Sequence, residues 1–420
     1  MKQREVKYSG IFWQPYIPKE WSVSRLKHVI TKLNRNREKN AELLVCSNCG
    51  DVKKRGDSKL GLVANSDDIY QGVKSGDLLI HGMDTWHGAI AVSKYDGMCT
   101  PVVHVCDSSH NKEYIATYLR NMATQKIFKL ISNGVRQNTS DFRSWDKVAR
   151  LPIPLPPLAE QEKIVRFIES KTLCIDAYVA ERERELQLLN ELKESEIANI
   201  ITRGLNPDVK MKDSGIPWIG MIPEHWDVVR IKAILSESKE KTDCDGGTLL
   251  SLSQYTGVTL KENAKKTGMF EAESTIGYNV VHPGQFVMNI MLAWNGSYAV
   301  SDFEGVISPA YCVFNFNVDC ERKYFHYLLR LQSYAGAFKT QSKGIIDSRL
   351  RLYPQYFLAF KTIVPPIEEQ RAIVNYIEDK CNKVNSLITE LETEIEFLKE
   401  YKQKLIADCV TGQIDVQSEI

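Results

Sequence analysis

The chain has 420 residues, of which 43% are hydrophobic and 25% are charged, a composition typical of globular proteins. This length predicts two or three domains, and the sequence has no run of about eighteen apolar residues, which argues against a transmembrane helix. The 10 cysteines are too sparse for a disulfide scaffold and no apolar signal segment follows the N-terminus, so we expect reduced thiols and a cytoplasmic protein.

The formal net charge of +1 hides an uneven distribution. Two long segments, residues 158–203 and 367–408, carry −3 and −4, which leaves +8 for the remainder of the chain. A basic surface of that kind suits contact with phosphate groups. A small excess spread over so many residues is equally compatible with an ordinary surface.

The first element in chain order is a short block, Ser9–Thr31, which recurs at Ser214–Ser236. Both copies keep Ser-Gly-Ile, Ile-Pro, Trp, Val, Arg and Lys in the same places. We interpret the block as a structural clip, in which the Trp and the Ile pack a turn onto a folded body and the next residues begin a helix or a strand.

Each half of the chain next shows a short strand followed by polar and basic residues. The strand Leu43–Cys46 precedes a loop, Asp51–Lys59, and the strand Thr248–Leu252 precedes a comparable stretch. Such segments can reach DNA phosphates and base edges, although ordinary surface loops have the same composition. The candidate DNA-binding residues here are Lys53, Lys54, Arg55, Gln254, Tyr255, Lys265 and Lys266.

A more specific match joins Gly76–Val105 to Gly284–Val313, in which Gly, Met, Trp, Ala-Val-Ser, Pro and Val coincide. Short apolar runs separated by glycine predict a meander of strands. A tryptophan at a turn commonly belongs to a core, yet the residue after it differs between the copies, as expected of a frame that reads different DNA sequences. The candidates at this predicted tip are Trp86, His87, Trp294 and Asn295.

Each half then has an amphipathic helix, predicted over Lys112–Leu130 and Lys323–Lys339, whose apolar stripe belongs to a core. A polar turn with a central glycine follows each helix. Arginine, glutamine and asparagine are side chains that pair bidentately with guanine and adenine edges. The candidates in and after these turns are Arg136, Gln137, Asn138, Lys343 and Arg349.

The segment LPPLAEQEKIVRFIESK, Leu155–Lys171, recurs as VPPIEEQRAIVNYIEDK, Val364–Lys380. Each copy opens a long charged segment with apolar residues at heptad spacing and no internal Gly or Pro, which predicts a coiled coil. The Pro-Pro pair disfavours helix before this point, and acidic residues follow in the first turn. Two similar helices in one chain most simply pair with each other, and antiparallel pairing would give a pseudo-two-fold molecule.

Motifs for catalysis are not found in the sequence. It has no Gly-rich phosphate loop ending in Lys-Ser or Lys-Thr, and no Asn-Pro-Pro-aromatic pattern of amino-methyltransferases. The one metal-like cluster is Cys46, Cys49, His104, Cys106 and His110, in which the first two cysteines have the spacing of a zinc pair. The second repeat has Leu252 and Tyr255 at those two cysteine positions. We therefore expect no metal, cofactor or catalytic residue on this chain.

The order of module, PPxxEQ helix, module and PPxxEQ helix resembles the specificity subunit of type I restriction-modification enzymes over essentially the whole chain. The PPLAEQ and PPIEEQ helix starts and the TWHGAIAVS and AWNGSYAVS blocks carry the resemblance most specifically. It implies an α+β chain with two tandem α/β target recognition domains, each followed by a long helix. The domains are then predicted at 1–155 and 206–363, the helices at 156–205 and 364–412, and a tail at 413–420.

The resemblance also implies the function and the partners. Each recognition domain would read one half of a bipartite DNA target, and the chain would be a non-catalytic scaffold for two modification and two restriction subunits. S-adenosylmethionine, ATP and Mg would be bound by those partners. Two other hypotheses stay open: a self-contained restriction-modification enzyme or nuclease, and a coiled-coil scaffold without a DNA role.

Overall fold

The computed structural model describes residues 4–36, 38, 41–56, 69–132, 142–263, 274–344, 346 and 349–418. The chain divides into two compact units, the first comprising Met1–Glu183 and Glu392–Ile420 and the second Arg184–Leu391. The division falls inside two long helices, α4 (Leu158–Arg203) and α9 (Ile367–Thr411), so each helix contributes one part to each unit. Within the described ranges no helix is long and apolar enough to cross a membrane.

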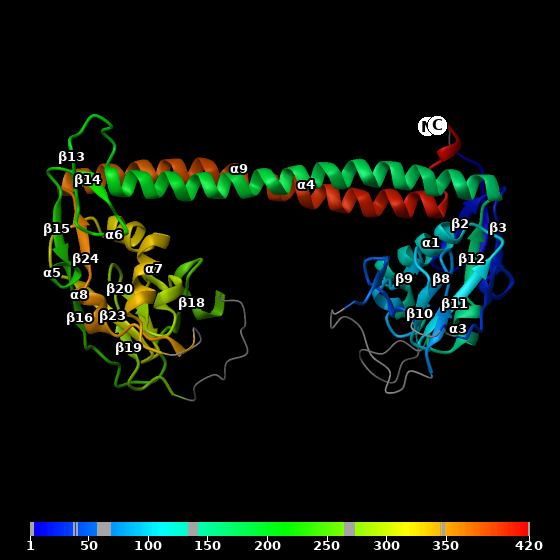
Figure 1. Ribbon diagram of the computed structural model, residues 1–420, viewed down its shortest axis with the longest axis horizontal. Helices are drawn as coiled ribbons and strands as arrows, with labels where there is room; N and C mark the ends of the chain where they lie inside the picture. The colour runs from blue at the N-terminus through cyan, green and yellow to red at the C-terminus, as the bar shows by residue number, and fades with distance from the viewer. Residues whose placement is uncertain are drawn as a thin grey trace. The chain divides into compact units, whose positions relative to one another are not determined.

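The first unit contains a four-stranded antiparallel sheet in the order β4-β11-β8-β9 (Figure 1). Its strands are β4 Ile30–Lys32, β11 Val103–Ser108, β8 Leu78–His81 and β9 Ile90–Val92. Four antiparallel pairs accompany it: β1 Val6–Ile11 with β2 Gln14–Pro18, β3 Ser22–Arg25 with β12 Pro152–Leu155, β5 Leu44–Cys46 with β6 Val52–Lys54, and β7 Gln71–Val73 with β10 Gly97–Cys99. Its short helices are η1 Leu26–His28, η3 Thr85–His87, α1 Lys112–Thr124, α2 Ile127–Leu130, α3 Trp145–Ala149 and η7 Val416–Ser418.

The second unit repeats this topology with the sheet β16-β23-β20-β21 (Figure 1). Its strands are β16 Leu235–Ser238, β23 Tyr311–Phe316, β20 Phe286–Asn289 and β21 Tyr298–Val300. The accompanying pairs are β13 Met211–Asp213 with β14 Met221–Pro223, β15 Asp227–Arg230 with β24 Lys361–Val364, β17 Leu250–Ser253 with β18 Gly257–Leu260, and β19 Asn279–Val281 with β22 Gly305–Ile307. Its short helices are α5 Ile231–Ile234, η4 Lys261–Asn263, η5 Ala293–Asn295, α6 Arg322–Leu329, α7 Gln332–Gln341 and α8 Pro354–Ala359.

Both faces of each central sheet are covered. In β8, Leu78 and Ile80 lie in the core that includes α1, whereas Leu79 lies in a second core with residues of the β5–β6 hairpin. In β20, Phe286 and Val287 are divided in the same way. Successive strand residues face opposite sides of a sheet, so burial on both sides explains why these strands read as unbroken apolar runs.

The helix predicted over Lys112–Leu130 is wrong as a single element. It is two helices, α1 and α2, separated at Lys126, which has a left-handed φ of 60° that ends the regular helix. The helix predicted over Lys323–Lys339 is likewise split into α6 and α7, because Leu331 between them is extended with ψ 142°. Apolar periodicity continues across both breaks, so the sequence pattern did not reveal them.

The repeated tryptophan of the clip makes the same contact in both units. Trp21 and Trp226 are fully buried, and their indole N–H groups donate to Glu160 Oε1 at 3.1 Å and Glu369 Oε2 at 3.0 Å. Each glutamate lies in the first turn of a long helix. The predicted packing role of the tryptophan is therefore confirmed, and its partner is the acidic residue of the PPxxEQ motif.

The glutamine of the motif joins each long helix to its unit. Gln161 Oε1 accepts from the Asn111 N–H at 3.0 Å, and Gln161 Nε2 donates to the Pro156 carbonyl at 2.8 Å. Gln370 repeats both bonds, accepting from the Glu321 N–H at 2.9 Å and donating to the carbonyl of the first motif proline at 2.8 Å. Asn111 and Glu321 are the residues that cap α1 and α6, so one buried amide fixes two helix starts.

The two long helices pair in antiparallel directions within each unit, as predicted. In the first unit Lys402 Nζ lies 2.6 Å from Asp176 Oδ1, and Lys399 Nζ lies 2.7 Å from Glu183 Oε1. In the second unit the Tyr376 hydroxyl donates to Glu196 at 2.9 Å. The heptad spacing predicts both Leu387 and Ile388 in the seam; this is wrong for Leu387, which is 49% exposed, whereas Ile388 is half-buried.

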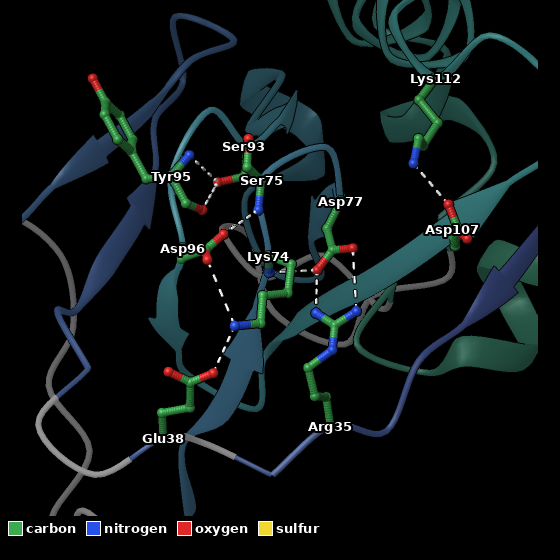
Figure 2. Close-up of polar contacts among 10 residues, drawn as sticks. All are labelled: Arg35, Glu38, Lys74, Ser75, Asp77, Ser93, Tyr95, Asp96, Asp107 and Lys112. Carbon is green, nitrogen blue, oxygen red and sulfur yellow. Dashed lines mark hydrogen bonds and ion pairs between the residues drawn. The ribbon is translucent and has the colours of Figure 1, made fainter.

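A charged network lies at one edge of the first unit, as Figure 2 shows. The Asp77 carboxylate is buried, is paired with Arg35 and accepts from the Lys74 N–H at 2.7 Å. A hydrogen bond from Lys112 lowers the pKa of Asp107, so this carboxylate stabilises the unit above a pH of about 4, and the contribution is lost as the pH falls. At the positions of Asp77 and Asp107 the second unit has neutral amides, and Gln285 Nε2 donates to Asn315 Oδ1 at 2.6 Å.

We expect Gln161→Ala to lower the free energy of unfolding by about 2 kcal/mol, because it leaves a buried N–H and a buried carbonyl without partners. Denaturant unfolding measures the change. Gln187→Ala, on an exposed position of the same helix, is the control and should cost much less. Equal effects of the two substitutions would contradict the role of Gln161.

We expect Arg35→Met to destabilise the first unit by about 3 kcal/mol, because it leaves the Asp77 carboxylate buried without its cation. Adding Asp77→Gln and Asp107→Asn gives these two positions the neutral amides that the second unit has there. The triple variant should regain most of the stability that Arg35→Met loses. Hydrogen exchange of β8 and β11 measures both effects. A triple variant no more stable than Arg35→Met would show that the two networks are not interchangeable.

Candidate nucleic-acid interface

Five of the predicted DNA-binding residues lie outside the described residues: Arg136, Gln137, Asn138, Lys265 and Lys266. The other candidates belong to the first two of three equivalent segments in the first unit and to all three in the second. These are the β5–β6 or β17–β18 hairpin, the turn after β8 or β20, and the chain that follows α2 or α7.

The basic residues of the first hairpin lie on a strand rather than in the predicted loop. Lys53 and Lys54 belong to β6, and the Arg55 N–H closes the ladder by donating to the Leu43 carbonyl at 2.9 Å. Both lysines are exposed, with Lys53 Nζ 3.5 Å from Asp51 and Lys54 Nζ 3.0 Å from Glu42. Exposed pairs of this kind are weak, so both ammonium groups can exchange these partners for phosphate.

The turn after β8 places Trp86 and His87 in the short helix η3, which ends at Gly88 with a φ of 79°. Trp86 is half-buried against the core, which agrees with the structural alternative for this tryptophan. His87 is exposed and lies 4.0 Å from Asp84. The polar residue therefore points to solvent from a fixed turn.

The second unit has the same turn with different chemistry. Trp294 in η5 donates to the Met291 carbonyl at 3.0 Å, and Lys339 Nζ lies 5.1 Å from the centroid of its ring. Asn295 is exposed at the position of His87. The second turn therefore has a lysine packed on its tryptophan, and an asparagine where the first turn has a histidine.

Each hairpin lies against the neighbouring turn. A Cβ placed on Gly88 would lie 3.8 Å from the Asn48 carbonyl oxygen, and one on Gly296 would lie 4.0 Å from Gln254 Cβ. Tyr255, next to Gln254, is 84% exposed. The structure therefore brings Gln254 and Tyr255 together with Trp294 and Asn295, which the sequence had placed in separate segments.

The chain after α7 returns to the same end of the sheet. Lys343 and Arg351 form an antiparallel bridge, and the Leu352 N–H donates to the Ile290 carbonyl at 2.9 Å, just beyond β20. Lys343 Nζ lies 5.1 Å from the centroid of the Tyr356 ring, and Arg349 is exposed. In the second unit, exposed cations thus lie beside the segment that leads from β20 into η5.

A cavity of about 470 Å³ opens in the first unit beside its hairpin and its turn. Its lining includes Asn48, Trp86 and Arg120, together with residues of both long helices. Burial raises the pKa of Glu113 in this lining and lowers the pKa of Arg120. Among the described residues, no group of three or more His, Cys, Asp or Glu side chains is arranged to hold a metal ion.

Sequence reasoning missed Arg120 and Arg330, which reach from α1 and from the end of α6 to the hairpin of their own unit. A signal was present, because each arginine follows a buried tyrosine, Tyr114 or Tyr324, by six positions. An arginine beside the apolar stripe of a helix has the pattern of a solvated residue, so the stripe alone does not indicate a buried contact.

No family model matches the chain. The chain is 22% identical over 440 residues to a provisionally named type I restriction enzyme MjaX specificity subunit of Methanocaldococcus jannaschii, which covers 96% of this chain and 95% of that protein. The fold of the present chain is similar to that of a chain in a structure describing complex assembly and conformational transition of the type I R-M system. The TM-score is 0.69 with 16% identity, and the match covers 95% of this chain and 99% of that one. An HsdS subunit from Thermoanaerobacter tengcongensis gives a TM-score of 0.53, 17% identity, and coverage of 95% and 98%.

These similarities extend over nearly the whole chain. They confirm the predicted resemblance to type I specificity subunits and the predicted α+β fold with two paired long helices. A role in DNA sequence specificity agrees with them.

Proposed function

We propose that this chain is the sequence-specific DNA-binding subunit of a type I restriction-modification complex, and that each unit reads one half of a bipartite target. The observation that carries the proposal is the pair of units with one topology and different polar residues at equivalent turns, His87 and Asn295. The whole-length similarity to specificity subunits supports it. Two different readers on one frame suit a target made of two different half-sites.

We assign the reading surface to the segments that meet beside each turn. Exposed lysines and arginines would hold phosphates, and asparagine, glutamine and tyrosine would contact base edges. The described members of this surface are Lys53, Lys54, Arg55, Trp86 and His87 in the first unit and Gln254, Tyr255, Trp294, Asn295, Lys343 and Arg349 in the second. Arg136, Gln137, Asn138, Lys265 and Lys266, which lie outside the described residues, are proposed as DNA-binding from the sequence alone.

The long helices would set the unread spacing and dock the partners. The 46 residues of α4 span about 70 Å. Both helices keep large apolar side chains exposed away from their seam, including Leu173 at 72%, Leu192 at 59% and Phe397 at 63%. Exposed apolar residues on a charged helix suit protein partners. We propose two modification subunits and two restriction subunits as those partners, with S-adenosylmethionine, ATP and Mg bound on them and no catalysis by this chain.

We expect Gln254→Ala with Asn295→Ala to relax base preference in one half-site by about 1–3 kcal/mol per lost contact and to leave the other half-site unchanged. The measurement is long-read mapping of methylated adenine in cells that express the full chain with its modification subunits. Lys361→Ala, exposed on β24 of the same unit, is the control. Equal relaxation of both half-sites would contradict the assignment.

Assays of the purified chain, together with the same mapping in cells that lack it, separate the other hypotheses. Methyl transfer by the purified chain alone would support a self-contained enzyme. Methylation that does not depend on this chain, together with no retention of a split-site duplex, would support a scaffold without a DNA role.

A further inference from the structure

Arg120 connects three parts of the first unit. Its guanidinium donates to the Gly50 carbonyl at 3.3 Å, to the Ile90 carbonyl at 3.0 Å and to the Thr117 hydroxyl at 2.9 Å. Gly50 belongs to the loop of the β5–β6 hairpin and Ile90 begins β9. One side chain from α1 therefore ties the hairpin loop to an edge strand of the central sheet.

Arg330 makes the equivalent connection in the second unit. Its guanidinium donates to the Tyr298 carbonyl at 2.7 Å and also to the Gln254 carbonyl. Tyr298 begins β21, the counterpart of β9, and Gln254 begins the loop of the β17–β18 hairpin. The two arginines thus come from equivalent helices and bind equivalent elements.

Burying these two guanidinium groups costs free energy, which their hydrogen bonds have to offset. Burial lowers the pKa of both guanidinium groups, which means that the protein disfavours their charge at these positions. The hydrogen bonds to carbonyl oxygens offset that cost, and the part supplied by Gly50 or Gln254 is lost when the loop moves away. The loop also fits the arginine closely, because a Cβ on Gly50 would lie 2.5 Å from Arg120 Cδ.

The loops themselves differ between the units. Residues 47–51 connect β5 to β6, whereas residues 254–256 connect β17 to β18. The arginine contacts the fourth residue of the longer loop and the first residue of the shorter one. Since it binds backbone carbonyls in both, the contact does not depend on which side chains the loop carries.

We propose that Arg120 and Arg330 are positioning residues, each of which fixes the hairpin loop of its unit at the angle that the unit's DNA half-site requires. This inference rests on the proposed function. The arginines do not touch bases; they hold the backbone of loops that carry different side chains in the two units, with Gln254 and Tyr255 in the second. A fixed anchor beneath a variable loop lets the frame accept new loop sequences without losing the loop's orientation.

The test uses the full chain co-expressed with its modification subunits and a pool of duplexes with a randomised central region. Selection by the wild-type complex defines both half-sites and their spacer. We expect Arg120→Lys to lower base discrimination about ten-fold in one half-site, and Arg330→Lys to do so in the other, because lysine keeps the charge but cannot bridge two carbonyls as the planar guanidinium does. Arg150→Lys and Arg230→Lys, exposed in the first and second units, are the matched controls.

A second variant perturbs the contact from the loop side. Gly50 has a φ of 78°, so Gly50→Ala both strains the loop and displaces it from Arg120 while leaving the arginine in place. It should relax the same half-site as Arg120→Lys. Thermal unfolding of each complex distinguishes this local loss of preference from a folding defect. A folding defect would reduce binding to every duplex without changing the preferred sequence.

Three outcomes overturn the proposal. Folded Arg120→Lys and Arg330→Lys complexes that keep both preferences would show that the arginines are structural only. Relaxation of both half-sites by either single variant would show that the effect is not local. A wild-type complex that enriches no split sequence would contradict the proposed function itself, and with it the role of both arginines.

Discussion

The hydrogen bond from a buried indole to the first turn of a long helix is the contact on which both units depend. Trp21 and Trp226 each bind the motif glutamate at the start of one long helix, and each also packs against the glycine that ends the other helix, Gly412 or Gly204. An indole N–H so placed needs an acceptor, and the glutamate supplies it where the helix dipole also favours a negative charge. One side chain thus joins the start of one helix to the end of its partner.

This junction explains why the units can differ so much elsewhere. The frame needs the tryptophan bonded to the glutamate and the glutamine bonded to the backbone at two helix starts. The hairpin loops and the turns after β8 and β20 take no part in that set. Their lengths and side chains can therefore change while the helices and the central sheets keep their places.

The sequence predicted the elements that repeat and missed those that depend on contacts between distant residues. Duplication located the clip, the strands around Trp86 and Trp294, and both long helices to within a few residues. It did not show that α1 and α2 are separate, because a single left-handed residue leaves no periodic signal. Nor did it show Arg120, whose partners lie 30 and 70 positions away. A backbone carbonyl as an acceptor leaves no trace in the identity of its residue.

The two units also satisfy one buried turn by different means, and this difference limits what repetition can reveal. Asp77, which pairs with Arg35 in the first unit, corresponds to Gln285 in the second, and Asn315, which accepts from Gln285, stands at the position of Asp107. Each set accepts from the backbone of the turn, at Lys74 or at His282. A charged carboxylate cannot be exchanged alone, because its cation would remain, so the whole network has to change at once. Networks confined to one unit can be replaced in this way, whereas the bond from Trp to the motif Glu and the two bonds of the motif Gln, which hold the long helices, recur in both units.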